Sequence, residues 1–427
     1  MYNCYSGGSR YCTASNPGGK IHGGYFSEIR MGSSGGGCSS PNGGGMVDLI
    51  AANKMTITGI SNNNISADGV GASCGDGSGG GIRLIAEDMN LSQSVLRANR
   101  GGSKGGYGRI KILYGSKNSI VTNTGSAVVE KSIIPPLDLK SSTHPDSNKY
   151  YNDNFKEFSI AWTRPFSSIV GYYYKINTSI PSSQSAVPST QSTFHTGETL
   201  SKTASALKAG NNYFHVVSVG PNATIGTVES MFKVKINSTP VTIKSTSHPS
   251  SGTWYNQTTI FLNWTNPIPD ADVSGYYYVL DKYADTIPDK TDKFLPTKDK
   301  NILFANRPVG TIWYFHVIAQ DTQGYLTKKA AHYKIQIGPN PGYGGISGEV
   351  RDDSSPTTID GVKITLNRGL QSTTSSNGGK YFFSNNVYAG TYELRATKTG
   401  YEDYVKTVIV TKGQNTSLNI LMKKKTP

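Results

Sequence analysis

Short apolar runs, separated by glycine-rich or polar turns, recur along the whole chain. In several runs apolar and polar residues alternate, as in FSIAWT from Phe158 and YFHVVSV from Tyr213. A period of two is typical of half-buried β-strands, and turns every ~8–12 residues are typical of all-β domains. The pattern predicts an all-β protein, with a short Gly-rich β-solenoid followed by three β-sandwich domains in a row.

One block of the sequence occurs twice. GYYY begins at Gly171 and again at Gly275, a tryptophan-bearing run precedes each copy at Trp162 and Trp264, and a YFHV run follows each. The offsets are 275 − 171 = 104 and 264 − 162 = 102 residues. A fixed self-similarity of ~100 residues indicates two copies of one domain.

The N-terminal region repeats a simpler form, a glycine turn followed by an apolar strand, in GGGMVDLIA, GGGIRLIAE and GGYGRIKILY. Gly45 to Gly81 is 36 residues and Gly81 to Gly108 is 27, so we expect Gly45 to stack beside Gly81 in successive coils of a solenoid. Asp48 then aligns with either Arg83 or Leu84. The region resembles Gly-rich parallel β-helices of bacterial surface proteins. Arg83, Arg97, Arg100 and Arg109 could line a solenoid face for an acidic glycan, and solvated strand faces are the alternative interpretation.

All four cysteines lie in the first 74 residues. Cys38 and Cys74 each stand seven residues before a glycine that opens a coil strand, so we expect them on adjacent coils and disulfide-bonded. Cys4 and Cys12 would form the second pair. A metal site is the rival interpretation, and it is disfavoured because no histidine falls at ligand spacing beside them.

These patterns predict four domains, with boundaries at 1–133, 134–238, 239–338 and 339–427. Residues 134–238 and 239–338 hold the duplicated block. On Trp162, Trp264 and the alternating YFHV strands, both copies resemble bacterial fibronectin type III or Ig-like surface modules. The resemblance implies that each tryptophan is buried between two sheets.

Aromatic and histidine side chains alternate along the repeated strands. One set of tyrosines must face outward, and an exposed aromatic strip could stack on sugar rings or on a neighbouring subunit. Ordinary cross-strand packing on a half-exposed sheet is the alternative. Neither histidine has a serine or cysteine nucleophile in motif context, so we expect no catalytic residues. The candidate contact surface comprises Tyr172, Tyr174, His215, Tyr276, Tyr278 and His316.

Three acidic residues of the second copy, Asp270, Asp272 and Asp321, could meet at one end of its sandwich and bind Ca²⁺ through carboxylate oxygens. The first copy has Ser168, Val170 and Gly220 at or near the corresponding positions, so any such site would occur once. This is a weak candidate, and no other cofactor is expected.

Residues 339–427 resemble the carboxypeptidase regulatory-like, transthyretin-like β-sandwich, on GVKITL, an Asn-Gly turn at Asn377, AGTYELRA and the GYE at Gly400. That module is an accessory fold without the zinc site, so the resemblance does not imply catalysis. In related pilin modules a lysine and an asparagine form an isopeptide bond, for which Lys363 and Asn419 are candidates. Ala396 stands where those modules place their acid, so we expect no such bond.

The net charge of +14 is spread along the chain, and without a basic stripe or recognition motif we expect no nucleic-acid partner. No apolar run reaches the ~18 residues of a membrane span. The start, MYNCYSGGSR, lacks the apolar core of a signal peptide, although chains of this composition are usually exported. We therefore expect Met1 to open either a truncated reading frame or a mature fragment.

The sequence as a whole favours a non-enzymatic, extracellular structural protein of the cell surface or matrix, self-associating into filaments, with the sandwiches as spacers. Two alternatives remain: a glycan-binding adhesin, and the accessory portion of a larger carbohydrate-active enzyme.

Overall fold

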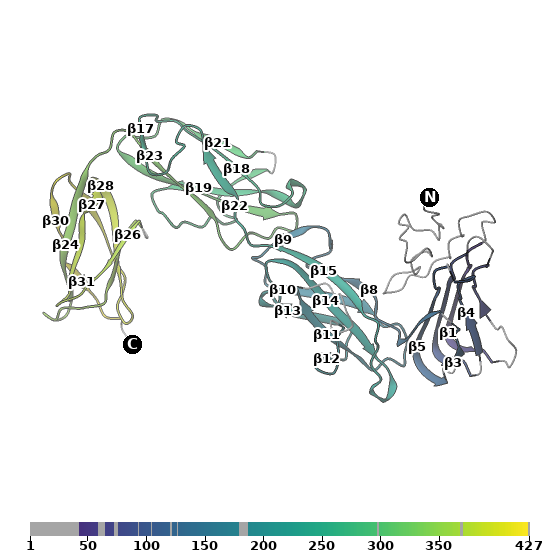
Figure 1. The fold of residues 1–427 in the computed structure, drawn as a ribbon. Helices are drawn as coiled ribbons and strands as arrows, with labels where there is room; N and C mark the ends of the chain where they lie inside the picture. Colours follow the sequence, from purple (N-terminus) through teal and green to yellow (C-terminus); the bar gives the residue numbers. More distant parts are fainter. Residues whose placement is uncertain are drawn as a thin grey trace. The chain divides into compact units, whose positions relative to one another are not determined.

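The computed structural model describes residues 42–425 except 59–64, 72–75, 93, 104, 120–121, 126, 179–186, 297–298 and 368–369. The described residues form strands and three short 3₁₀ turns, η2 (Ala204–Ala206), η3 (Pro221–Ala223) and η4 (Asp270–Asp272), and no α-helix occurs among them. The predicted all-β fold class is confirmed (Figure 1).

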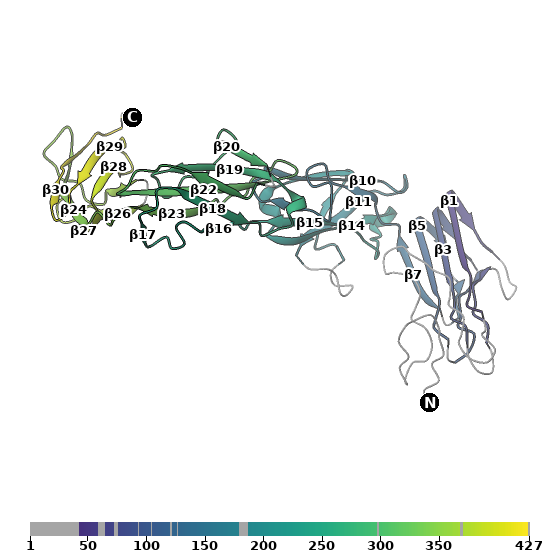
Figure 2. The ribbon, with the colours of Figure 1, turned by 90° about the horizontal axis from the view of Figure 1, so that it is seen from above.

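The N-terminal region is built from parallel strands stacked coil on coil. One sheet has the order β1-β3-β5-β7 and the other β2-β4-β6, and Figure 2 shows the first sheet's strands side by side. The first sheet comprises β1 (Met46–Thr56), β3 (Gly81–Asn90), β5 (Arg109–Ser119) and β7 (Val128–Ile133), and the second β2 (Ile65–Ser66), β4 (Ser94–Arg97) and β6 (Thr122–Asn123).

The register of these coils differs by one residue from the predicted spacing. Met46, not Gly45, is the Cα partner of Gly81, because the Gly81 N–H donates along the slanted parallel ladder to the Gly45 carbonyl at 3.1 Å. Of the two partners considered for Asp48, the structure selects Arg83, whose Nε donates to Asp48 Oδ1 at 2.9 Å.

Glycines in this region allow main chain to approach main chain. A Cβ added at Gly80 would lie 1.9 Å from the Gly45 carbonyl oxygen, and one at Gly108 would lie 2.4 Å from that of Ala98. Only a residue without a side chain fits such a corner. The apolar side chains of β3 and β5 that face the interior, Ile82, Leu84, Ile110 and Ile112, are fully buried.

The first sandwich packs a three-stranded sheet, β13-β10-β8, against a sheet containing β12-β11-β14-β15 in that order. Trp162 lies between the sheets, with its ring 5.2 Å from Tyr172 and 5.7 Å from Phe214. The strands are β8 (Leu137–Lys140), β10 (Glu157–Thr163), β11 (Gly171–Asn177), β12 (Thr193–His195), β13 (Thr199–Thr203), β14 (Gly210–Val219) and β15 (Ser230–Asn237).

The second sandwich repeats this arrangement with sheets β16-β18-β21 and β17-β23-β22-β19-β20. Trp264 lies 5.3 Å from Tyr276 and 5.8 Å from Phe315, so the aromatic contacts of the first copy recur. The strands are β16 (Thr242–Ser245), β17 (Trp254–Tyr255), β18 (Ile260–Thr265), β19 (Val273–Asp281), β20 (Lys293–Pro296), β21 (Asn301–Phe304), β22 (Thr311–Asp321) and β23 (Ala331–Ile337).

The C-terminal module is a further two-sheet structure around its own apolar core. Its sheets have the orders β27-β24-β30, with β31 also paired to β24, and β26-β25-β28-β29. Asn377 and Gly378 have φ of 52° and 79°, which is the left-handed turn expected before β27. The strands are β24 (Tyr343–Asp352), β25 (Lys363–Leu366), β26 (Gln371–Thr374), β27 (Lys380–Tyr388), β28 (Gly390–Thr397), β29 (Tyr404–Val410), β30 (Asn415–Ser417) and β31 (Ile420–Met422).

The chain divides into two compact units. The first comprises the described residues up to Asn148 together with Lys156–Lys235, and the second comprises Lys149–Phe155 together with Ile236 onward. The second unit therefore includes a seven-residue segment with β9 (Tyr150–Asn152), which lies in sequence between β8 and β10 and is hydrogen-bonded to β15 as the fifth strand of that sheet.

We expect Gly80→Ala to destabilise the solenoid by about 1–3 kcal/mol, because the added methyl group would meet backbone atoms that cannot move independently. Gly45→Ala is the matched control: a Cβ there meets no heavy atom within 4 Å, and the cost should stay below about 1 kcal/mol. Urea-induced unfolding of both variants tests this difference, and equal costs would show that the close approach is not limiting.

Candidate functional site

The structure contradicts the predicted contact surface. Tyr172, Tyr276 and both YFHV histidines are fully buried, Tyr174 is buried, and Tyr278 is half-buried. The prediction chose the wrong tyrosines, because those that alternate with Tyr173 and Tyr277 point into each sandwich and pack against its tryptophan or phenylalanine.

Each buried histidine is instead part of a polar network on its sheet. His215 Nδ1 lies 3.1 Å from Glu229 Oε1, and its Nε2 lies 3.1 Å from Asn177 Oδ1. His316 occupies the same place in the second copy, but its Nδ1 faces His332 Nδ1 at 2.6 Å and its Nε2 lies 3.2 Å from an Asp281 carboxylate oxygen. These contacts give both histidines a structural role.

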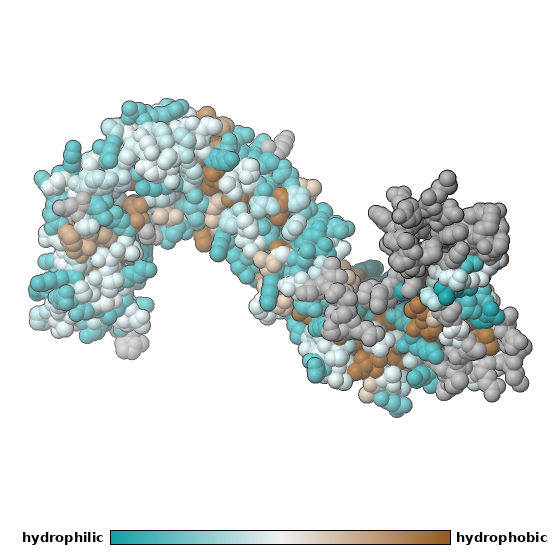
Figure 3. Space-filling model, in the orientation of Figure 1, coloured by the Kyte–Doolittle hydropathy of each residue, from teal (hydrophilic) through white to brown (hydrophobic). Residues whose placement is uncertain are grey.

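The exposed aromatic residues in the described part of the two sandwiches are ones that the sequence prediction missed. Phe194 and Phe294 are each 46% exposed, and their rings lie 5.2 Å from Tyr173 and 5.0 Å from Tyr277. Each phenylalanine covers the glycine of GYYY, whose missing side chain leaves room for the ring. The sequence does contain a signal for this pair, because the two phenylalanines are 294 − 194 = 100 residues apart, close to the offset of the repeat. On the face shown in Figure 3, hydrophobic residues form separate patches among hydrophilic ones.

The arginines considered for an acidic glycan are largely engaged within the solenoid. Arg83 pairs with Asp48, and Arg97 Nη2 lies 2.8 Å from Asp68 Oδ2. The Arg100 guanidinium lies 4.6 Å from the Tyr107 ring centroid. The predicted disulfides of Cys4, Cys12, Cys38 and Cys74 lie outside the described residues and stay predictions.

The three aspartates proposed for Ca²⁺ have other partners. Asp270 is exposed and pairs with Lys300, which lowers its pKa. Asp272 and Asp321 are buried, and their carboxylates accept backbone N–H groups from Tyr150 and Asn152 of the segment Lys149–Phe155. Within the described part of the chain, no group of three His, Cys, Asp or Glu side chains is arranged to hold a metal ion.

Asp321 is the most heavily hydrogen-bonded of the three. Its Oδ1 accepts the N–H groups of Gln323 at 2.9 Å and Tyr325 at 2.8 Å, while Oδ2 accepts that of Asn152 at 2.7 Å. Burial raises the pKa of this carboxyl to about 6 although these donors favour the ionised form. One oxygen therefore holds the turn after β22, and the other is available to the segment.

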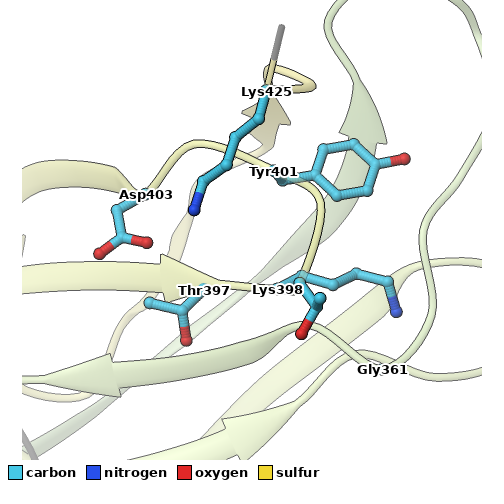
Figure 4. A pocket seen from close by; sticks show the side chains of 7 residues that line it. Gly361, Thr397, Lys398, Tyr401, Asp403 and Lys425 are labelled. Atoms are coloured by element: carbon cyan, nitrogen blue, oxygen red, sulfur yellow. The ribbon is translucent and has the colours of Figure 1, made fainter. Parts of the chain in front are cut away.

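An open hollow of about 630 Å³ lies at one end of the C-terminal module. Its walls carry Thr397, Tyr401, Asp403 and two lysines, Lys398 and Lys425. Figure 4 shows the Lys425 side chain extending toward the strand that carries Thr397, with Asp403 beside it. Lys398 Nζ donates to the Asp360 carbonyl at 2.8 Å, so only part of this positive charge faces the hollow.

No helix among the described residues has the length and apolar character needed to cross a membrane.

Residues 345–423 match the family model of the carboxypeptidase regulatory-like domain. The resemblance predicted for the C-terminal module is thereby confirmed. No curated protein matches the chain.

Among solved structures, the chain is similar to fibronectin(III)-like modules of Clostridium thermocellum CbhA. The sequence identity is 14%, the match covers 47% of this chain and 94% of that chain, and the TM-score is 0.22. A two-domain fibronectin type III segment of chicken tenascin has 13% identity, 47% and 98% coverage and a TM-score of 0.22. BcpA, the major pilin subunit of Bacillus cereus, has 12% identity, 60% and 95% coverage and a TM-score of 0.18. At these TM-scores no functional argument rests on the likeness.

His144 and His248, each followed by proline, are buried at equivalent places in the two sandwiches. Burial lowers the pKa of His144 to about 4, against 6.5 in an unfolded chain. As the pH falls below 6.5, the unfolded state gains its proton first. Stability is therefore lost between pH 6.5 and 4.

Acidification should lower the free energy of unfolding of the first unit less in His144→Phe than in the wild type, by up to about 3 kcal/mol, because phenylalanine cannot take up a proton. The measurement is urea-induced unfolding of the wild type and the variant at pH 7 and pH 4.5. His195→Gln, which replaces a more exposed histidine of the same sandwich, is the matched control for the loss of a histidine side chain. Parallel pH profiles for wild type and His144→Phe would contradict the assignment.

Proposed function

We propose that this chain is a non-enzymatic, extracellular structural protein of the cell surface or matrix, in which the tandem sandwiches act as spacers. One observation carries the proposal. The conspicuous aromatic residues of the repeat perform the same internal packing twice, with Trp162 on Phe214 and Trp264 on Phe315. Because the same residues build the core of both sandwiches, their duplication favours a spacer role over a catalytic site that occurs once.

The buried polar residues support the same conclusion. His215 and Glu229 are both fully buried and 3.1 Å apart, with Asn177 on the other side of the imidazole. Pairing of this kind compensates buried polar groups and fixes the register of the sheet. These residues therefore stabilise the fold.

Self-association would use an open sheet edge. β29 is the terminal strand of its sheet among the described residues, and Val405 and Ile409 on it are 48% and 64% exposed. A terminal strand with exposed β-branched residues can pair with a strand of another chain. Repeated pairing of this kind propagates into filaments.

We expect filaments in electron micrographs of the purified protein, and we expect Val405→Lys combined with Ile409→Lys to abolish them. Lysine on an edge strand opposes pairing through charge repulsion and desolvation. Ile287→Lys is the matched control, because Ile287 is 57% exposed but lies outside the strands. Filaments that persist in the double variant would exclude β29 as the contact, and monomers in the wild type would contradict assembly.

Glycan binding is the second candidate, favoured by the exposed rings of Phe194 and Phe294 beside Tyr173 and Tyr277. Aromatic faces of this kind can stack on sugar rings. On a glycan array that includes acidic glycans, we expect any binding to fall at least about tenfold in Phe194→Leu combined with Phe294→Leu, since leucine covers the glycine without a flat ring. An array with no bound glycan would rule out this candidate.

A further inference from the structure

The segment Lys149–Phe155 binds to the second sandwich as an extended peptide. The N–H groups of Tyr150, Asn152 and Asn154, at every second residue, donate to Asp272 Oδ2 at 3.1 Å, Asp321 Oδ2 at 2.7 Å and the Leu326 carbonyl at 3.0 Å. Backbone N–H groups of alternate residues lie on the same edge of an extended segment, so the second sandwich contacts one edge of this segment, while β9 pairs with β15 in the sheet of the first sandwich.

Side chains of the segment add specificity. Asn152 is fully buried, and its Nδ2 donates to the carbonyls of Ala319 at 3.0 Å and Tyr325 at 3.1 Å. Its Oδ1 accepts from Asn237 Nδ2 at 2.8 Å, so every polar group of this side chain has a partner. Phe155 is buried with its ring 5.8 Å from that of Tyr325.

The residues that receive the segment form a socket, which comprises Asp272, Ala319, Asp321, Tyr325 and Leu326. The turn of the socket is held by contacts within the second sandwich, because Asp321 Oδ1 accepts the N–H groups of Gln323 and Tyr325, neither of which belongs to the segment. An empty socket would leave the second oxygen of Asp321 and nearby carbonyls without these donors. Binding of the segment gives the Asp321 carboxylate a charge-assisted hydrogen bond from the Asn152 N–H at 2.7 Å, so the socket favours occupation.

We propose that the socket also takes the Lys149–Phe155 segment of a second copy of the chain, so that copies become joined by segment exchange. The same hydrogen bonds would form in either case. The stretch that connects the two sandwiches, between Asn237 at the end of β15 and Thr242 at the start of β16, is short, and short connections favour exchange between chains.

The chain's own segment competes with that of a second copy for the socket, and it is present at a high effective concentration because it belongs to the same chain. Joined copies should therefore form when the local concentration is high or when intrachain binding is blocked. Exchange between two chains gives a closed dimer, and open-ended exchange gives a chain of copies. The inference deepens the proposed structural role by naming its partner, but it does not depend on β29 or on filaments.

The test uses two full-length variants with complementary defects. Asn152→Ala has a defective segment and an intact socket. Asp321→Asn has an intact segment and a defective socket. The new amide NH₂ stands where a carboxylate oxygen accepted the Asn152 N–H, so that hydrogen bond is lost. The amide oxygen of the new side chain can still accept the N–H groups of the turn. Each variant alone should be monomeric, and only their mixture can form the intact contact between chains.

We expect native mass spectrometry of the mixture to show at least about tenfold more heterodimer than a matched mixture of Asn152→Ala with the double variant Asn152→Ala/Asp321→Asn. Equal amounts of heterodimer in the two mixtures would overturn the proposal. If either variant fails to fold by circular dichroism, donor- and acceptor-labelled wild-type chains are mixed and warmed instead. Energy transfer that unlabelled wild type suppresses then supports exchange, and its absence overturns it. Filament microscopy is read separately, so either proposal can fail alone.

Discussion

The packing of one tryptophan against the facing sheet determines most of each sandwich. Trp162 stacks on Phe214 at an interplanar angle of 28°, and Trp264 meets Phe315 at 33°. Because successive strand residues point to opposite faces, this contact fixes which side of each neighbouring strand is internal. A shift of one residue would move Tyr172 or Tyr276 from the core to solvent, and burial of such large rings makes that shift costly.

The sequence contains enough information for the fold class, the duplication and the C-terminal module, because each rests on local periodicity or on a repeated motif. It did not determine which tyrosines of GYYY face inward, since alternation defines two sets without assigning either to the core. The outer face of the second sandwich is also less open than a strand pattern implies. The Tyr283 carbonyl, which follows β19, lies 3.0 Å from His316 Nε2 and covers that histidine.

The binding of Lys149–Phe155 could not be predicted from local pattern. Asn152 and Asp321 are separated by 169 residues, and neither lies in a recognisable motif. The sequence analysis singled out these aspartates only as candidate Ca²⁺ ligands. Backbone N–H groups of a distant segment use those oxygens in the structure, and a single sequence gives no signal for that partner.

The two copies are most informative where they differ. Gly220 stands in the first copy where Asp321 stands in the second, so the first copy lacks this carboxylate. The counterpart of Asn152 in the second copy is Asn256, which is exposed, while its neighbour Trp254 lies 5.2 Å from Tyr388 of the C-terminal module. The same strand-edge segment therefore makes a polar contact in one copy and an aromatic contact in the other. Shared residues of the repeat build the cores, and residues that differ between the copies make the contacts that only one copy has.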